Sequence, residues 1–264
     1  MSHLNLALLG MLGLTVAVAQ KEPSFEVVSA RAVLERDGVP IGFGSKPHRT
    51  QGRLSWTTTA LHLVSYAHNM PEWRISGLKP EMSFYTIEAT MDPTATEDDV
   101  RSMLRAMLKE RFGFAAHSES KEVSGYVLVV GKNGPKIRTA RSETASMPAY
   151  LGAKPAEAFE GRIFSSMEGP GTSAITGRRV PIQRLADELS GALSAFVDDR
   201  TGLSGDYYFG FTFQRPGFAA TGAVDLAPSV FDAIQESLGL RLEKARRGVD
   251  FLVVDQIHKL PTDN

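Results

Sequence analysis

The stretch TEDDVRSMLRAMLKERFGFAAHSESKEVSGYVLVV, Thr96 to Val130, predicts a helix, its end and the extended chain that follows. Apolar residues recur there at the spacing of a helix that buries one stripe: Val100, Met103, Leu104, Met107 and Leu108. Thr96 and Asp99 fit a capping box at the start of this helix, and Gly113 fits a left-handed residue at its end. The chain after Gly113 predicts a β-hairpin with its turn near Gly125.

A shorter stretch with the same pattern lies near the C-terminus, SVFDAIQESLGLRLEKARRGVDFLVV, Ser229 to Val254. When Gly113 is aligned with Gly239, the apolar positions of the two helices coincide, so we expect both glycines at helix ends with a positive φ angle. The elements predicted ahead of each helix also repeat in order. The sequence therefore predicts an α+β fold with an internal duplication of a strand-helix-strand-strand-helix-strand-strand module, its helices packed on small mixed sheets.

The same kinds of pattern predict the other elements and the domain boundaries. Helices are expected at Thr58 to His68 and Pro181 to Leu193, and strands at Phe25 to Ala32, Gly52 to Thr57, Trp73 to Ile75, Phe84 to Met91, from Phe159 and Glu160 onward, and at Tyr207 to Phe213. The segment Lys132 to Thr176 is rich in Gly, Pro, Ser and Thr and is interpreted as a linker or a long functional loop. The expected division is a signal peptide at 1–19, a first module at 20–133, a linker at 134–158 and a second module at 159–264.

Composition and the N-terminus point to export without a charged partner. The 264 residues carry 29 basic and 30 acidic side chains, which favours neither a nucleic-acid partner nor a polybasic membrane patch. Leu4 to Val18 is almost continuously apolar, and Ala17-Val18-Ala19 fits a signal-peptide cleavage site, with an uncleaved anchor or a buried helix as the alternatives. We expect a periplasmic or extracellular protein with no membrane span after cleavage. Because there is no cysteine, disulfides and Cys-ligated metals are excluded.

Four runs of residues resemble a known family over nearly the whole mature chain. They are Phe25 to Ser29, Leu108 to Val130 with Gly134-Pro135-Lys136, Asp199 to Gly205, and Phe251 to Asp255. They resemble the soil-associated bacterial family of exported proteins of unknown function. The resemblance implies export but no activity or catalytic residue, and some relatives carry the domain beside membrane-bound sensor metallopeptidases of the antirepressor type. Family members usually continue Gly-x-Tyr-Asp-Phe, whereas this chain has Tyr208 before Phe209 and so lacks that Asp.

The second copy is more distantly similar to the short N-terminal modules of secretins and TonB-dependent receptors. The shared features are Leu185-Ala186-x-x-Leu189, the Leu203-Ser204-Gly205 turn and Leu238-Gly239-Leu240. This likeness implies a fold and a role in contacts with other proteins, whereas function has to be argued from a site.

Two groups of polar residues are candidates for chemistry. His117 and Glu119 alternate on a predicted strand, so both side chains face one side, where a metal or general-base role competes with a solvated strand face. Asp198 and Asp199 are neighbouring carboxylates that suit acid/base work if their pKa values differ. The alternative is a charged turn in which Asp199 accepts hydrogen bonds from the backbone near Thr201.

The candidate binding residues are Asp199, Arg200, Thr201 and Tyr208. Arg200 is the expected polar anchor because its planar fork suits a carboxylate or a pair of carbonyls. We expect the site to combine the turn from Asp199 to Gly205 with the connection from Lys132 to Thr176, whereas a structural turn beside a linker is the alternative. In the aromatic strand, Tyr207, Phe209, Phe211 and Phe213 share the core face and Tyr208 points outward.

The preferred function is an exported, cofactor-free and non-catalytic binding or protein-interaction module of the cell envelope. Its partner would be another envelope protein or a small ligand. One alternative is an extracytoplasmic sensor or regulatory domain for a partner peptidase. A second alternative is a hydrolase, which would require His117, Glu119, Asp198 and Asp199 to converge on one cleft.

The leader sequence gives the first testable prediction. We expect cleavage between Ala19 and Gln20 in the native host, because the apolar run ends in the small-residue pattern that signal peptidases accept. Intact-mass measurement of the envelope-localised protein checks this. Retention of Met1 or Ser2 on that protein would identify an uncleaved anchor instead.

Overall fold

The fold is α+β, as predicted. The structure is a computed structural model that describes residues 23–33, 46–78, 84–139, 159–169, 171–217 and 227–258. The expected leader and most of the expected linker lie outside these residues. The helices are α1 (Ala60–Ala67), α2 (Glu97–Phe112), α3 (Ile182–Leu193) and α4 (Val230–Leu238), with a short 3-10 turn, η2 (Glu72–Arg74). The strands are β1 (Val27–Val33), β2 (His48–Thr50), β3 (Arg53–Thr59), β4 (Ile75–Ser76), β5 (Phe84–Thr90), β6 (Ala115–Val130), β7 (Arg162–Gly169), β8 (Thr172–Pro181), β9 (Val197–Asp199), β10 (Asp206–Gln214) and β11 (Leu240–Gln256).

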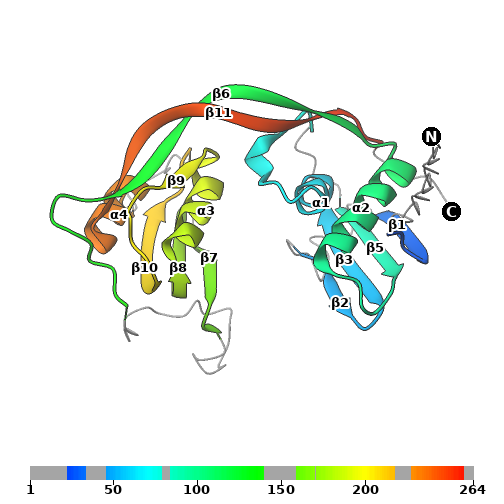
Figure 1. Cartoon of the computed structure of the whole chain (residues 1–264), viewed down its shortest axis with the longest axis horizontal. Coiled ribbons are helices and arrows are strands. Elements are labelled where there is room, and N and C mark those ends of the chain that lie inside the picture. The colour runs from blue at the N-terminus through cyan, green and yellow to red at the C-terminus, as the bar shows by residue number, and fades with distance from the viewer. Residues whose placement is uncertain are drawn as a thin grey trace, which may run out of the picture.

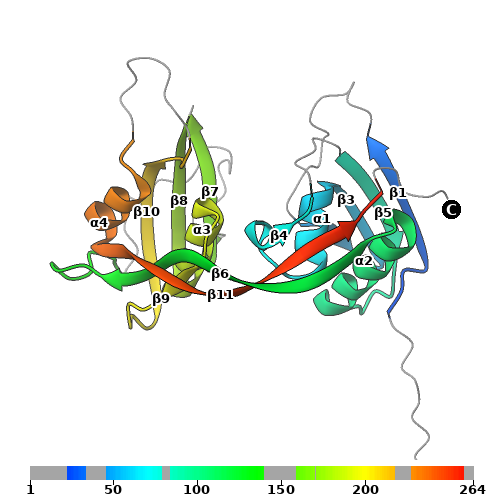
Figure 2. The same cartoon turned by 90° about the horizontal axis from the view of Figure 1, so that it is seen from above.

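The molecule consists of two lobes joined by a long two-stranded ribbon (Figure 1). The first lobe contains β1 to β5 with α1 and α2, and its sheet has the order β1-β5-β3-β2. The second lobe contains β7 to β10 with α3 and α4, and its sheet has the order β10-β8-β7. The ribbon is formed by β6 and β11, and it runs along one side of both lobes when the molecule is seen from above (Figure 2). None of the helices in the described residues is long and apolar enough to span a membrane.

Each lobe has its own hydrophobic core. In the first lobe the predicted stripe of α2 packs with α1 against the inner faces of β3 and β5, so that Leu104, Leu63 and Ile87 are fully buried. In the second lobe α3 and α4 cover β8 and β10. All four residues predicted for the buried face of α3, and all four aromatic residues predicted for the core face of β10, are buried there: Ile182, Leu185, Ala186, Leu189, Tyr207, Phe209, Phe211 and Phe213.

The ribbon strands pass from one lobe into the other. β6 and β11 pair antiparallel from Leu240 opposite Val130 to Gln256 opposite Ala115. At one end β9 pairs in parallel with the last part of β6, and at the other end β4 pairs in parallel with the last part of β11. Consequently β6 begins beside the first lobe and ends in the second, whereas β11 runs the opposite way. Leu128 of β6 lies in the second core, and Leu252 of β11 packs on the first.

The predicted turn near Gly125 is wrong, because β6 is one continuous strand. Gly125 faces Ala245 in the ribbon, and a Cβ atom at Gly125 would lie 2.5 Å from a ring carbon of Phe196. The glycine therefore serves the close approach of an aromatic ring rather than a reversal of the chain. Arg247 completes this contact: its guanidinium lies 4.4 Å from the centre of the Phe196 ring and donates two hydrogen bonds of 3.0 Å to Asp198.

Three further predictions were wrong in detail. Phe159 and Glu160 do not begin a strand, because Gly161 has a φ of 73° and β7 starts at Arg162. Trp73 belongs to η2 rather than to a strand, and only Ile75 and Ser76 pair with β11. The interpretation of Lys132 to Thr176 as a single connection is also wrong, since its last part forms β7 and the start of β8, with Ile175 in the core.

The two glycines aligned in the sequence have the predicted conformation. Gly113 ends α2 with a φ of 56°, and Gly239 ends α4 with a φ of 66°, both in the left-handed region. The capping box is present as well: Thr96 Oγ1 accepts from the Asp99 amide, and the Asp99 carboxylate accepts from the Thr96 amide at 2.9 Å. Superposition of the two predicted copies stays a prediction.

Gly239 and Gly202 provide a matched pair for testing backbone strain against crowding. Their φ angles are 66° and 68°, so Ala at either position incurs a strain of about 1 kcal/mol. A Cβ atom at Gly239 would lie 2.3 Å from the Gly134 carbonyl oxygen, whereas at Gly202 the space is open. We expect Gly239→Ala to lower the free energy of unfolding by at least about 1 kcal/mol more than Gly202→Ala. Urea denaturation measures both, and equal losses would contradict the crowding at Gly239.

Candidate functional site

The structure does not bring the four predicted hydrolase residues together. Asp198 faces Val127 across the β6–β9 pair, and Val127 lies ten positions after His117, or about 33 Å along an extended strand. Three of these side chains also have a nearby partner of their own. His117 contacts Asp255 at 2.9 Å, Glu119 contacts Lys121 at 2.8 Å, and Asp198 is held by Arg247.

The predicted binding turn is organised by its own side chains. Asp199 Oδ1 accepts from the Thr201 amide at 2.9 Å and from the Thr201 hydroxyl at 2.7 Å, and Thr201 Oγ1 accepts in turn from the Leu203 amide. This is the charged turn considered as the alternative for Asp199. Arg200 donates its amide to the Leu128 carbonyl, and its exposed guanidinium makes no polar contact with the described residues.

Tyr208 belongs to a different cluster, beside β7 and β8. Its hydroxyl donates to Glu160 at 2.6 Å, and the guanidinium of Arg178 lies 5.8 Å from the centre of its ring. The hydrogen bond to Glu160 raises the pKa of Tyr208. Arg178 is buried and reaches Glu160 at 3.4 Å, while the next residue, Arg179, has a φ of 51° at a bulge in β8. Among the described contacts, none joins Tyr208 to the Asp199–Thr201 turn.

The Gly134-Pro135-Lys136 run closes the end of α4. The Lys136 amide donates to the Leu238 carbonyl at 2.8 Å, and the Lys136 ammonium donates to the Glu236 carbonyl at 2.9 Å. Both carbonyls lie in the last turn of α4, where a helix leaves acceptors without partners. A cation at this end also complements the helix dipole. This motif therefore has a structural explanation.

Polar side chains converge instead on a pocket of about 360 Å³ beside α1 in the first lobe. Its wall is formed by the exposed face of α1, by the chain that follows α1, and by Arg101 of α2. We refer to it as the α1 pocket, and it is lined by Lys46, His62, Ser65, Tyr66, Asn69, Met70, Pro71, Glu72 and Arg101. The volume falls within the range of small-molecule sites.

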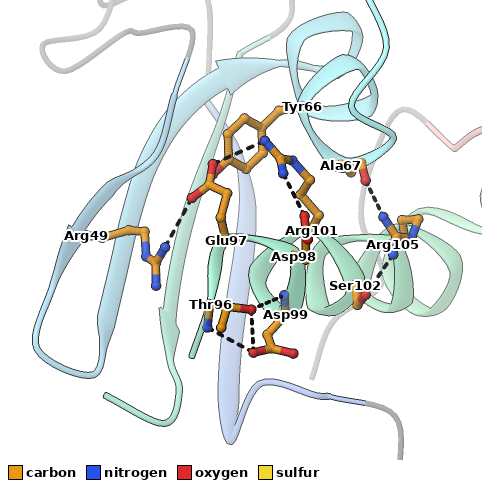
Figure 3. A network of polar contacts seen from close by, with 10 residues as sticks. All are labelled: Arg49, Tyr66, Ala67, Thr96, Glu97, Asp98, Asp99, Arg101, Ser102 and Arg105. Carbon is orange, nitrogen blue, oxygen red and sulfur yellow. Dashed lines mark hydrogen bonds and ion pairs between the residues drawn. The ribbon is translucent and has the colours of Figure 1, made fainter. Parts of the chain in front are cut away.

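A hydrogen-bonded network holds Tyr66 in place at this pocket (Figure 3). The Tyr66 hydroxyl donates to Glu97 at 2.6 Å, and Glu97 also accepts from Arg49 at 3.1 Å. Arg101 covers the Tyr66 ring, with its guanidinium 5.4 Å from the ring centre. Burial of the phenol, followed by the hydrogen bond to Glu97, raises the pKa of Tyr66 well above its ordinary value. The phenol is thereby fixed as a neutral donor.

His62 joins α1 to the chain that follows it. Its Nδ1 lies 2.9 Å from Thr59 Oγ1, and its Nε2 lies 3.0 Å from Glu72. Thr59 Oγ1 also accepts from the His62 amide and thereby caps α1. The Thr59 hydroxyl, the His62 imidazole and the Glu72 carboxylate are arranged like a proton relay. However, the Thr59 hydroxyl oxygen already accepts the hydrogen bond that caps α1. The contacts of His62 thus fix Glu72 at the pocket wall.

The loop after α1 is also held from several sides. Asn69 has a φ of 50°, the Met70 amide donates to the Ser65 carbonyl, and the Ser65 hydroxyl donates to the Met70 carbonyl at 2.7 Å. Arg105 caps the end of α1 by donating to the Ala67 carbonyl at 2.6 Å. A positive φ at a residue other than Gly costs energy and is typical of turns and functional sites. The pocket wall is therefore a fixed structure.

Sequence reasoning predicted the helix from Thr58 to His68, which contains His62 and Tyr66, but missed the pocket. The partners of Tyr66 and His62 are Glu97 and Glu72, which are 31 and 10 residues away along the chain, so no local pattern links them. The one local signal is Thr59 three residues before His62, which fits a helix cap. Within the described residues no three His, Asp or Glu side chains are grouped as metal ligands.

Comparison with known proteins places this two-lobed α+β chain in a family. Residues 61–257 match the family described as "Protein of unknown function (DUF3738)". The chain belongs to this family, because the match covers most of its length. Neither the curated proteins nor the solved structures contain a match.

The environment of Tyr66 predicts a late alkaline titration. The folded state holds the phenolic proton of Tyr66 more tightly than the unfolded state does. The contribution of Tyr66 to the free energy of unfolding is therefore fully present below about pH 10 and is lost as the pH rises above that value. We expect the ultraviolet difference between the wild type and Tyr66→Phe to show a phenol that ionises well above pH 10. Glu97→Gln should lower this pKa without restoring its ordinary value, since burial is the larger cause. Ionisation of Tyr66 near pH 10 in the folded protein would contradict this network.

Proposed function

We propose that the protein is an exported binding module of the cell envelope that takes a small anionic ligand in the α1 pocket. The single observation that carries the proposal is the convergence of polar groups from α1, α2 and two loops on one pocket whose wall is fixed by hydrogen bonds. Preorganised walls favour binding because the ligand does not have to order them. The predicted leader at 1–19 supports export.

The choice of an anionic ligand rests on two hydrogen-bond donors at the pocket that have no acceptor among the described residues, the Lys46 ammonium and the Arg101 Nε atom. Lys46 lines the pocket, and its ammonium makes no polar contact with the described part of the chain. The Nε atom of Arg101 is buried and has no hydrogen-bond partner there. A ligand that supplies a carboxylate oxygen would give the Lys46 ammonium an acceptor. Arg101 adds positive charge at the wall, although its two Nη atoms already donate to Asp98 and Glu97. Met70, Pro71 and the Tyr66 ring provide apolar surface for the rest of a small carboxylate.

Binding of small carboxylates tests the proposal. Acetate, succinate and citrate would each be titrated into the protein by calorimetry, with chloride at the same ionic strength as the reference. We expect saturable binding of at least one of them, and a loss of about tenfold or more in affinity for Lys46→Ala and for Arg101→Lys. Arg200→Ala is the matched control, because Arg200 is an exposed arginine on the other lobe. Its affinity should equal that of the wild type.

Two outcomes would contradict the proposal. If Arg200→Ala weakens binding while Lys46→Ala and Arg101→Lys do not, the site lies at the Asp199–Gly205 turn. If none of the three carboxylates binds in a saturable way, the α1 pocket is not a carboxylate site. Far-ultraviolet circular dichroism of each variant separates loss of binding from loss of folding.

A further inference from the structure

The centre of the edge strand β7 carries none of the side chains that usually prevent pairing, and the irregularity in its pairing with β8 lies at its end, between Met167 and Gly169. The strand pairs with β8 along one side, and no described residue forms a backbone hydrogen bond with its other side. Edge strands in soluble proteins usually carry a Lys, a Pro or an inward charge at their centre. In the first lobe the edge strand β1 has Arg31 in its middle, whereas the centre of β7, Ile163 to Met167, has no charge and no proline. Met167 is 74% exposed.

The pairing pattern shows which backbone groups of β7 face outward. The Tyr208 amide points away from β8 and donates to the Arg138 carbonyl. Because the amide and carbonyl groups of successive residues point to opposite sides of a strand, those of the next residue, Phe209, point toward β8, where Phe209 lies opposite Gly177. The neighbouring residue of β8, Thr176, then directs its backbone toward Phe164 of β7. Since these directions alternate along a strand, the outward groups of β7 are those of Ile163, Ser165 and Met167.

An antiparallel pair of two β7 strands, centred on Ser165, matches side chains as well as backbone groups. In this register Ser165 faces Ser165 of the second copy, Ile163 faces Met167, and Arg162 faces Glu168. The outward amides and carbonyls at Ile163, Ser165 and Met167 are then opposite one another, as an antiparallel ladder requires. A shift by one position places outward groups opposite inward ones, and a shift by two places Arg162 opposite Ser166, or Glu168 opposite Phe164. Only the centred register joins opposite charges at both ends.

The side chains at the ends of β7 are available for this contact. Arg162 and Glu168 are exposed, and neither forms an ion pair with the described residues. Glu168 accepts a hydrogen bond from Ser166, which orients its carboxylate beside the strand. Ser165 donates to Glu188 of α3 at 2.6 Å, so the centre of the contact is formed by backbone groups rather than by this hydroxyl.

We propose that a second copy of this chain binds along β7, so that two protomers share a continuous sheet in the order β10-β8-β7-β7-β8-β10. The contact is isologous: each copy uses the same strand, and each Arg162 meets the Glu168 of the other copy. An edge of this length buries less surface than a standard interface, so the dimer forms and dissociates reversibly. This proposal does not depend on the ligand of the α1 pocket.

Sedimentation equilibrium of the purified protein tests the proposal, using charge reversals that the symmetry makes complementary. The wild type should approach twice the protomer mass as its concentration is raised toward about 1 mM. Arg162→Glu brings two carboxylates together at each end of the contact, and Glu168→Arg brings two guanidinium groups together there. Each variant alone should therefore dimerise at least about tenfold more weakly than the wild type. In an equimolar mixture, a dimer of unlike chains has a carboxylate of one variant opposite a guanidinium of the other at both ends, so the mixture should recover association.

Ser165→Pro provides an independent test, because it removes an outward amide that the protomer does not use. This variant should remain folded by circular dichroism and be monomeric. A wild type that stays monomeric throughout the concentration range would overturn the proposal. So would a mixture of the two charge variants that associates no better than either variant alone.

Discussion

The antiparallel pairing of β6 with β11 is the interaction on which the rest of the structure depends. A two-stranded ribbon is marginally stable in water by itself, and this one is about 53 Å long. It is stabilised because each end becomes part of a larger unit. β9 and the second core hold one end, and β4 and the first core hold the other. Each ribbon strand starts in one lobe and ends in the other. Each core therefore includes residues from both halves of the sequence, such as Leu128 in the second core and Leu252 on the first.

Because β6 and β11 pass from one lobe to the other, the two lobes do not coincide with the two consecutive modules expected from the sequence. The expected modules at 20–133 and 159–264 divide the chain in order, but Leu252 and Ile257 pack on the core of the first lobe. Near the middle of the ribbon, Phe196 stacks on Gly125 while Arg247 binds Asp198. Toward the other end, Arg74 donates to the Asp250 carbonyl at 2.7 Å and Trp73 meets the Phe251 ring. Each lobe therefore contacts the ribbon through an aromatic side chain, Phe196 or Trp73, and through an arginine, Arg247 or Arg74.

Features with local causes could be predicted from the sequence, and features with distant causes could not. The stripe of α2, its capping box and the glycine at its end depend on residues within a few positions of each other. Gly125 shows the opposite case, because a glycine inside an extended run fits both a turn and a close approach. Only Phe196, which is 71 positions away, decides between them. The strand expected from Phe159 was placed three residues early, because the positive φ angle of Gly161 delays the start of β7 to Arg162.

The candidate site residues also separate into those with local partners and those with partners far away in the sequence. Asp199 and Thr201 were correctly seen as a distinctive polar run, and their hydrogen bonds are local, so the turn alternative could be stated in advance. The α1 pocket instead depends on Glu72, which joins it to the ribbon. Glu72 lines the pocket, Arg74 donates to the Asp250 carbonyl, and Ile75 pairs with Leu252, all within four residues of one chain segment. A displacement of the pocket wall would therefore strain the attachment of β4 to β11. The ribbon thus holds one end of this segment, and His62 holds its first residue, so the pocket wall is supported from two sides.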